Sequence, residues 1–549
     1  MSYFTSLSSR RKFFKKAATA GAVAAISPAL TAARAIAREP FPAAVDVSPF
    51  ELDEITTSEL QDGMQSGKFT AQLLVEKYAE RIHEIDKHGP GVNAVIEMNP
   101  DAPSIAATLD QERKAKGPRG PLHGIPVLIK DNIATADRMM TTAGSLALVG
   151  SKPPKDSFVS QKLRAAGAVI LGKTNLSEWA NMRSSHSTSG WSGRGGLTKN
   201  PYALDRNPCG SSSGTGAGIS ANLAAVGIGT ETDGSIVCPS SSNGLAGIKP
   251  TVGLISRSRI IPISHSQDTA GPMCRTVRDA AILLSALTGV DPDDPATAAS
   301  LGKSQTDYSR YCDANGLKGA RVGVVRKYFG ISEAVDALMQ QALDVMKQQG
   351  ATLVDPADIP THGKFDDSEG TVLSYEFKAD LNQYLAQLGS SAPVHSLKEV
   401  IEFNERNRQK EMPYFGQDLM LKAENRGPLS DKDYLDALTK TRQLARTEGI
   451  DAIMDEQQLD ALVAPTGGPS WVTDLINGDH FSGGSSNAAA VAGYPNINVT
   501  AGFIFGLPVG ISFFGRAWSE PVLIKLAYAF EQATKARQEP RFLPTLHLS

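Results

Sequence analysis

The sequence predicts a layered α/β protein. Short apolar segments of strand type alternate with helical segments through most of the 549 residues, a pattern typical of a sheet covered by helices. Hydrophobic residues make up 41% and charged residues 21% of the chain, as expected for a globular protein with a substantial core. Strand-like segments return near the C-terminus after a more charged stretch, so both parts are expected to build one core.

Residues 1–37 are expected to be a twin-arginine-type signal peptide outside the fold. An Arg-Arg-Lys-Phe-Phe motif at residues 10–14 precedes a weakly apolar run, which ends on the small-residue sequence Ala-Ile-Ala at 35–37. We therefore expect export of the folded protein to the periplasm or beyond, with an uncleaved anchor or a chance basic stretch as the alternative. Later apolar runs fall short of the ~20 residues of a membrane span.

Residues 38–549 are expected to form a single domain, with its core in 70–330 and 456–545. Thr70 is expected to cap a helix, because Leu74 and Tyr78 follow at helical spacing. The other helices are expected from Thr57, over 101–116, 157–166, 277–287 and 521–535, and as a small-residue helix inside 207–239. Strands are expected over 92–98, 127–129, 168–171, 245–249, 321–325, 461–465 and 506–512. Residues 330–455 are richer in charge and are expected to be a helical elaboration.

The stretch from Asn207 to Pro239 holds two glycine-flanked serine motifs. The first is the cluster Ser211, Ser212 and Ser213, and the second is Ser235. Glycines allow backbone N–H groups to turn toward one point, so this arrangement indicates nucleophilic chemistry on a carbonyl if a base is near. Taken singly, a serine in a glycine-rich loop is more often a turn residue.

Lys130 is a candidate base because it ends an apolar strand. Desolvation there disfavours the ammonium, and a neutral amine can accept a proton. The alternatives are a lysine that reaches the surface or pairs with Asp131. Lys173 also ends a strand, so the residues alone leave it open as a rival base.

Other patterns point elsewhere and are rejected on context. The phosphate-loop expression at 167–174 has a strand where free N–H groups are needed, and the GxSxG match at 210–214 lacks a preceding strand. No histidine, cysteine and carboxylate cluster has metal-ligand spacing, so no metal or cofactor is expected. A net charge of -3 argues against nucleic-acid binding. The four cysteines are too few for a disulfide scaffold; Cys209 and Cys238 are predicted to be buried free thiols, although pairing stays open.

The lysine and the serines together resemble the amidase signature family. The motifs that carry the resemblance are GIPVLIKDN (124–132), GKTNLSEWA (172–180), CGSSSG (209–214), GTETDGS (229–235) and GIKPTVG (247–253). The family's fold is a large mixed β-sheet with helices on both faces. Its catalytic group is Lys–(cis)Ser–Ser, which removes Lys173 from the catalytic role. The resemblance implies the following roles: Lys130 as base, Ser211 as bridging cis-peptide serine, Ser235 as nucleophile, backbone N–H groups of Thr232, Asp233, Gly234 and Ser235 as oxyanion donors, and Ser212 as a supporting serine.

Departures from the commonest family pattern narrow the branch. Cys209 and Ser213 stand at positions where glycine is usual, and Asp233 replaces a glycine before the nucleophile motif. Together with GTETDGSIVCP these residues look most like peptide amidases. The resemblance therefore implies a monomeric enzyme that hydrolyses C-terminal peptide amides through an acyl-enzyme and releases ammonia. Alternatives are a broader aryl or aliphatic amidase, a glutamine-amidase subunit of a tRNA-dependent amidotransferase, and a non-catalytic binding protein.

Overall fold

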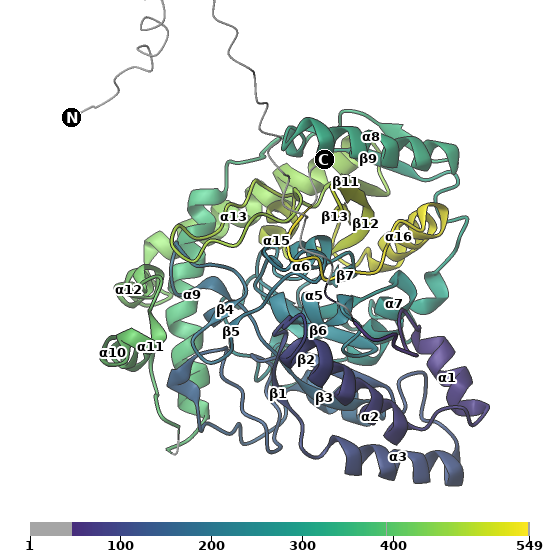
Figure 1. Ribbon diagram of the computed structural model, residues 1–549. Helices are drawn as coiled ribbons and strands as arrows, with labels where there is room; N and C mark the ends of the chain where they lie inside the picture. Colours follow the sequence, from purple (N-terminus) through teal and green to yellow (C-terminus); the bar gives the residue numbers. More distant parts are fainter. Residues whose placement is uncertain (1–44, 46, 391, 547–549) are drawn as a thin grey trace, which may run out of the picture. The chain divides into compact units, whose positions relative to one another are not determined.

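The computed structural model describes residue 45 and residues 47–390 and 392–546. Its centre is an eleven-stranded mixed sheet in the order β1-β3-β2-β6-β8-β7-β12-β13-β11-β9-β10 (Figure 1), which confirms the predicted fold class. The strands are β1 (Val95–Met98), β2 (Pro126–Lys130), β3 (Val169–Thr174), β6 (Val226–Glu231), β7 (Ala246–Lys249), β8 (Thr269–Cys274), β9 (Arg321–Val324), β10 (Thr352–Val354), β11 (Ala461–Pro465), β12 (Asn496–Ile504) and β13 (Leu507–Phe514). A separate small sheet pairs β4 (Trp191–Ser192) with β5 (Gly196–Leu197). The predicted signal peptide lies outside the described residues.

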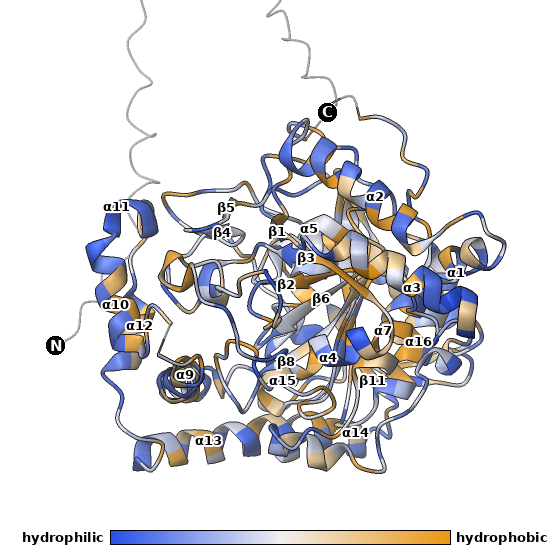
Figure 2. Cartoon of the chain, turned by 90° about the horizontal axis from the view of Figure 1, so that it is seen from below, coloured by the Kyte–Doolittle hydropathy of each residue, from blue (hydrophilic) through white to orange (hydrophobic). Residues whose placement is uncertain are grey.

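Helices lie on both sides of the strands. In the view of Figure 2, α3, α7 and α16 lie to one side, and α9, α10 and α12 lie to the other. The helices are α1 (Thr57–Gln65), α2 (Ala71–Arg81), α3 (Ala102–Lys116), α4 (Phe158–Ala165), α5 (Ser213–Ser220), α6 (Val237–Ser242), α7 (Val277–Leu287), α8 (Glu333–Gln348), α9 (Asp366–Gln387), α10 (Leu397–Arg406), α11 (Arg408–Glu411), α12 (Asp418–Glu424), α13 (Lys432–Ala445), α14 (Asp451–Glu456), α15 (Asn487–Ala492) and α16 (Glu520–Thr534). None of those in the described part of the chain is long and apolar enough to cross a membrane.

Several predicted elements have the observed bounds, and others were missed. The Thr70 side chain accepts a hydrogen bond from the Leu73 N–H and caps α2 as predicted. Helix α7 and strand β11 begin and end where the sequence places them. The structure differs at the start of the predicted helical elaboration, because β10 pairs in parallel with β9 and α8 packs on β12. The helices that depart from the sheet begin with α9.

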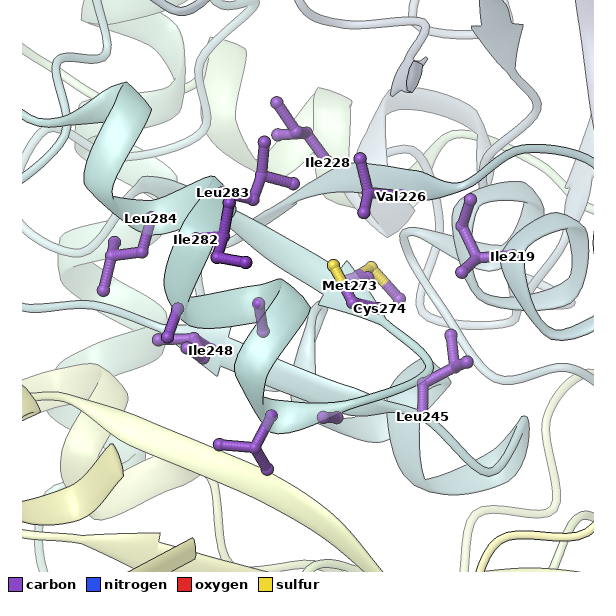
Figure 3. Packing of buried hydrophobic residues seen from close by; sticks show 14 of the residues in the cluster. Ile219, Val226, Ile228, Leu245, Ile248, Met273, Cys274, Ile282, Leu283 and Leu284 are labelled. Carbon is purple, nitrogen blue, oxygen red and sulfur yellow. The ribbon is translucent and has the colours of Figure 1, made fainter. Parts of the chain in front are cut away.

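The core beside β6 holds the strand that leads into the second serine motif. Val226 and Ile228 of β6 lie near Met273 of β8 and Leu283 of α7, and all four are buried (Figure 3). On its other edge β6 pairs in parallel with β2, with Ile129 opposite Ile228. Parallel strands end at the same edge of a sheet, so the C-terminal ends of β2 and β6 lie side by side.

Candidate active site

Strand pairing places Lys130 next to Thr230. Lys130 is the last residue of β2, and its side chain is 0% exposed. Its Nζ lies 3.2 Å from the Thr230 carbonyl oxygen and 2.9 Å from Thr230 Oγ1. Asn132 Nδ2 also donates to Thr230 Oγ1, at 2.9 Å. Thr230 therefore fixes the amine at the sheet edge.

The same amine contacts the first serine motif. Lys130 Nζ lies 2.7 Å from Ser211 Oγ, and Ser211 is also 0% exposed. Burial lowers the pKa of Lys130 to about 7, although the nearby carboxylates of Asp268 and Glu231 act in the opposite direction. The alternative pairing with Asp131 does not occur, because that carboxylate accepts from the Thr142 hydroxyl instead. A large neutral fraction of Lys130 is thus present near pH 7.

Ser212 ties the first motif to the second. The peptide bond from Gly210 to Ser211 is cis. The next N–H, of Ser212, donates to the Ser235 carbonyl oxygen at 3.2 Å. Ser212 Oγ donates to the Thr230 carbonyl at 3.0 Å and accepts from the Thr230 N–H at 3.2 Å. The predicted catalytic residues therefore share one network of direct contacts through residues 211 and 212.

Ser235 lies in the turn between β6 and α6. The Glu231 carboxylate accepts from the backbone N–H groups of Ile236, at 2.8 Å, and Val237, at 3.0 Å, which holds the first turn of α6 against the end of β6. Gly234 has φ +79°, and a Cβ there would lie 3.0 Å from Ser486 Oγ. Glycine is required at this position because the left-handed backbone strains other residues.

The groups that would meet a substrate are not engaged elsewhere. Within the described chain, the N–H groups of residues 232–235 and the Ser235 hydroxyl make no hydrogen bond, and the hydroxyls of Ser211 and Ser235 do not bond each other. Ser235 is 7% exposed. A serine hydroxyl without a partner, next to four unbonded donors, can attack a carbonyl whose oxygen the donors receive.

A cavity of about 500 Å³ adjoins this turn. Thr230 and Thr232 form part of its wall, and Thr232 Oγ1 donates to Asp268 Oδ1 at 2.6 Å. Asp268 Oδ2 also accepts from the Ile263 N–H at 2.8 Å, so one carboxylate joins the turn to the opposite wall. The rest of the lining combines apolar and charged side chains, among them Ala180, Ile260, Ile261, Ile263, Tyr384, Arg257, Arg259, His265 and Asp380. The cavity can hold a small organic amide or a short peptide end.

Lys173 contacts neither serine motif among the described hydrogen bonds. Its Nζ donates to the Ile133 carbonyl at 2.5 Å and to Thr141 Oγ1 at 2.9 Å. Burial lowers its pKa to about 8. Lys173 is therefore a buried structural lysine. Sequence reasoning missed Thr230 and Asn132, although both lie inside motifs that it used.

The predicted free thiols of Cys209 and Cys238 are wrong. The two cysteines form a disulfide, with Cα atoms 6.0 Å apart and 29 residues between them in sequence number. Cys274 and Cys312 are free. The disulfide joins the segment before Ser211 to the helix after Ser235. The sequence could not distinguish the two states because cysteine spacing alone does not report distance in the fold.

Removing this disulfide is expected to destabilise the protein and weaken activity. Closing a loop of this length contributes about 3.5 kcal/mol in the chain-entropy treatment, which corresponds to a fall in melting temperature of roughly 3 °C for a chain of this size. Calorimetry and ammonia release from the double variant Cys209→Ser/Cys238→Ser measure both effects. Cys312→Ser is the matched control and is expected to behave like the wild type. A double variant as stable and active as the wild type would contradict this role.

The nearest arrangement to a metal site in the described residues is an ion-pair network. Ligand atoms of His265, Glu376 and Asp380 lie within 4.8 Å of one another. Glu376 already accepts from Ser266 Oγ at 2.6 Å and Tyr434 Oη at 2.7 Å, and His265 Nδ1 lies 2.9 Å from Asp380. Although burial opposes the charged ring, Asp380 and Glu376 raise the pKa of His265. The network joins α9 to the loop that lines the cavity.

Comparisons with known proteins agree with this geometry. The Amidase family profile matches residues 74–524, and the chain belongs to this family. The "Probable amidase" of Arabidopsis thaliana is 43% identical over 90% of this chain and 93% of that protein. A crystal structure of native peptide amidase from Stenotrophomonas maltophilia is 50% identical over 90% of this chain and 99% of its own, with a TM-score of 0.85. One component of the glutamyl-tRNA(Gln) amidotransferase of Thermoanaerobacter pseudethanolicus is 32% identical over 89% of this chain and 99% of that protein. The chain is an amidohydrolase that acts on C–N bonds.

Proposed function

We propose that this enzyme hydrolyses the C-terminal carboxamides of peptides through an acyl-enzyme on Ser235, and that Lys130 and Ser211 activate that serine. The observation that carries the proposal is the contact of the buried, low-pKa amine of Lys130 with Ser211 Oγ. A neutral amine has two N–H donors and one lone pair. The two oxygens of Thr230 can receive both donors, which leaves the lone pair for the Ser211 hydroxyl proton.

The reaction would proceed in two halves. As Ser235 Oγ attacks the carboxamide carbon, its proton passes to Ser211 and the Ser211 proton passes to Lys130. The carbonyl oxygen becomes an oxyanion that the N–H groups of Thr232, Asp233, Gly234 and Ser235 would receive. The ammonium of Lys130 then returns a proton through Ser211 to the nitrogen, and ammonia leaves. Water hydrolyses the ester by the same relay in reverse. The two hydroxyls need to approach only when a substrate is bound, since catalytic hydrogen bonds often tighten in the complex.

The substrate class is supported by similarity and by space. The peptide amidase of known structure is 50% identical over nearly the whole fold, and the cavity of about 500 Å³ beside Thr232 can receive the residue next to the carboxamide. The amidotransferase relative supports a second candidate, hydrolysis of free glutamine. An aryl or aliphatic amidase is the third.

A comparison of three substrates separates these candidates. We expect kcat/KM for an amidated tripeptide to exceed that for a simple aliphatic amide and that for free glutamine by at least about tenfold, because binding energy from the rest of the peptide lowers the barrier. Ammonia release measures all three, and the same peptide with a free carboxylate is the control for contaminating peptidases. Equal or higher kcat/KM for glutamine or for the simple amide would overturn the peptide assignment.

We further propose export by the twin-arginine route and a monomeric state. The export proposal rests on the motif at residues 10–14. The N-terminal sequence of the protein recovered from the periplasm and its mass by light scattering test the two statements. An N-terminus at Met1 in the cytoplasm, or a dimer mass, would overturn them respectively.

A further inference from the structure

A ring of hydrogen bonds encloses the peptide between Thr232 and Asp233. Its other members are Gln267, Glu369 of α9 and Asn487 of α15, which come from three segments far apart in the sequence. The proposed mechanism uses none of these three side chains.

The ring closes in four further steps. Gln267 Nε2 lies 3.4 Å from the Thr232 carbonyl oxygen and 2.9 Å from Glu369 Oε1. Asn487 Nδ2 donates to the other oxygen of Glu369 at 2.7 Å and to Asp233 Oδ2 at 3.1 Å. Each amide group therefore bridges Glu369 to one of the two consecutive residues of the turn, and Glu369 is the shared acceptor.

The ring lies in a tightly packed and poorly solvated place. Gln267 and Glu369 are buried, and Ser486, the neighbour of Asn487, donates to Asp233 Oδ1 at 2.6 Å. The same Ser486 hydroxyl is the atom that a Cβ on Gly234 would meet. The turn thus has little room to rotate once these bonds are made.

Rotation of this peptide is what the proposed chemistry must prevent. An N–H group stabilises an oxyanion only when it points at the place where the charge develops, and small displacements cost large factors in rate. A change in the Thr232–Asp233 peptide plane would turn the Asp233 N–H away from the substrate oxygen.

We propose that Gln267, Glu369 and Asn487 are positioning residues that clamp the 232–235 turn in the orientation required for oxyanion binding. This inference rests on the proposed function, because it takes those N–H groups as the oxyanion donors. The clamp acts on the turn from the side chain of Asp233 and from the carbonyl of Thr232, and it touches no reacting atom.

Asn487→Ala and Glu369→Gln test the clamp. Asn487→Ala removes both bonds of one bridge, and Glu369→Gln replaces one acceptor oxygen by an NH₂ group that faces a donor. We expect kcat to fall by about 10- to 100-fold in each variant, while KM for an amidated peptide changes by less than about threefold. The inhibition constant of a peptide aldehyde, whose adduct with Ser235 carries the oxyanion, should rise in parallel with the loss in kcat. Inhibition by the peptide acid product should not change.

The control is Asn404→Ala, which removes a buried asparagine of α10 that donates to Gln417 Oε1. It is expected to keep kcat and aldehyde affinity within about twofold, so that loss of stability alone is separated from loss of the clamp. Wild-type kcat and aldehyde affinity in Asn487→Ala and Glu369→Gln, alongside an inactive Ser235→Ala, would overturn the clamp and leave the proposed function intact. Full activity of Ser235→Ala would instead overturn the proposed function.

Discussion

Replacing Ser235 by alanine is expected to lower kcat for amide hydrolysis by about four to six orders of magnitude. The substitution removes the oxygen that would form the acyl-enzyme, and members of a catalytic serine group are strongly non-additive. Because the Ser235 hydroxyl makes no hydrogen bond within the described chain, its loss leaves no partner unsatisfied. The variant should therefore fold and melt like the wild type. Ammonia release from purified protein measures the effect, with circular dichroism as the check on folding.

A second serine provides a matched control for this variant. Ser240 of α6 is buried, and its hydroxyl has no hydrogen-bond partner among the described residues. Ser240→Ala makes the same chemical change in the helix that follows Ser235, and it is expected to keep kcat within about twofold. If Ser235→Ala released ammonia at the wild-type rate, the assignment of the nucleophile would be wrong.

Replacing Lys130 by methionine is expected to lower kcat by at least about a thousandfold, because the relay then lacks its base. The wild type should also show a pH dependence with a definite sign. Since burial lowers the pKa of Lys130 to about 7, the amine is neutral above that pH and protonated below it. kcat/KM should therefore rise through pH 7 and fall tenfold per unit on the acid side. The residual activity of Lys130→Met should lack this limb.

Lys173→Met distinguishes this effect from the general loss of a buried lysine. Lys173 lies in the neighbouring strand β3 and bonds the Ile133 carbonyl and Thr141. Its variant is expected to be less stable, because those acceptors lose their donor, yet to retain the acid limb near pH 7. An acid limb that disappeared in Lys173→Met and persisted in Lys130→Met would reverse the two roles.

The sequence predicts much of the fold because the informative patterns are local. Helix α7 follows from its cap at Thr276 and its apolar spacing, and strand β11 follows from a short apolar run. Strand β8 was missed because Gly271 and Pro272 lie in its middle, and both residues argue against a strand. Strand β10 was missed because only three residues pair there, at the sheet edge.

The site divides in the same way. Lys130, Ser211 and Ser235 could be predicted because each lies in a short motif whose family resemblance assigns it a place. The disulfide of Cys209 and the clamp residues Glu369 and Asn487 could not, because they depend on contacts between segments with no local signal. Asp233 was recognised as a departure from the family pattern, and its contacts with Ser486 and Asn487 give that departure a physical role.

The rate at which a fluorophosphonate modifies the enzyme, followed by peptide mapping across pH, tests the central claim most directly. Such a reagent reports the reactivity of the nucleophile without a substrate or an amide leaving group. We predict a single adduct on Ser235 whose rate of formation rises through pH 7, and a slow, pH-independent rate in Lys130→Met. An adduct on another residue, or an unchanged rate profile in Lys130→Met, would contradict this prediction.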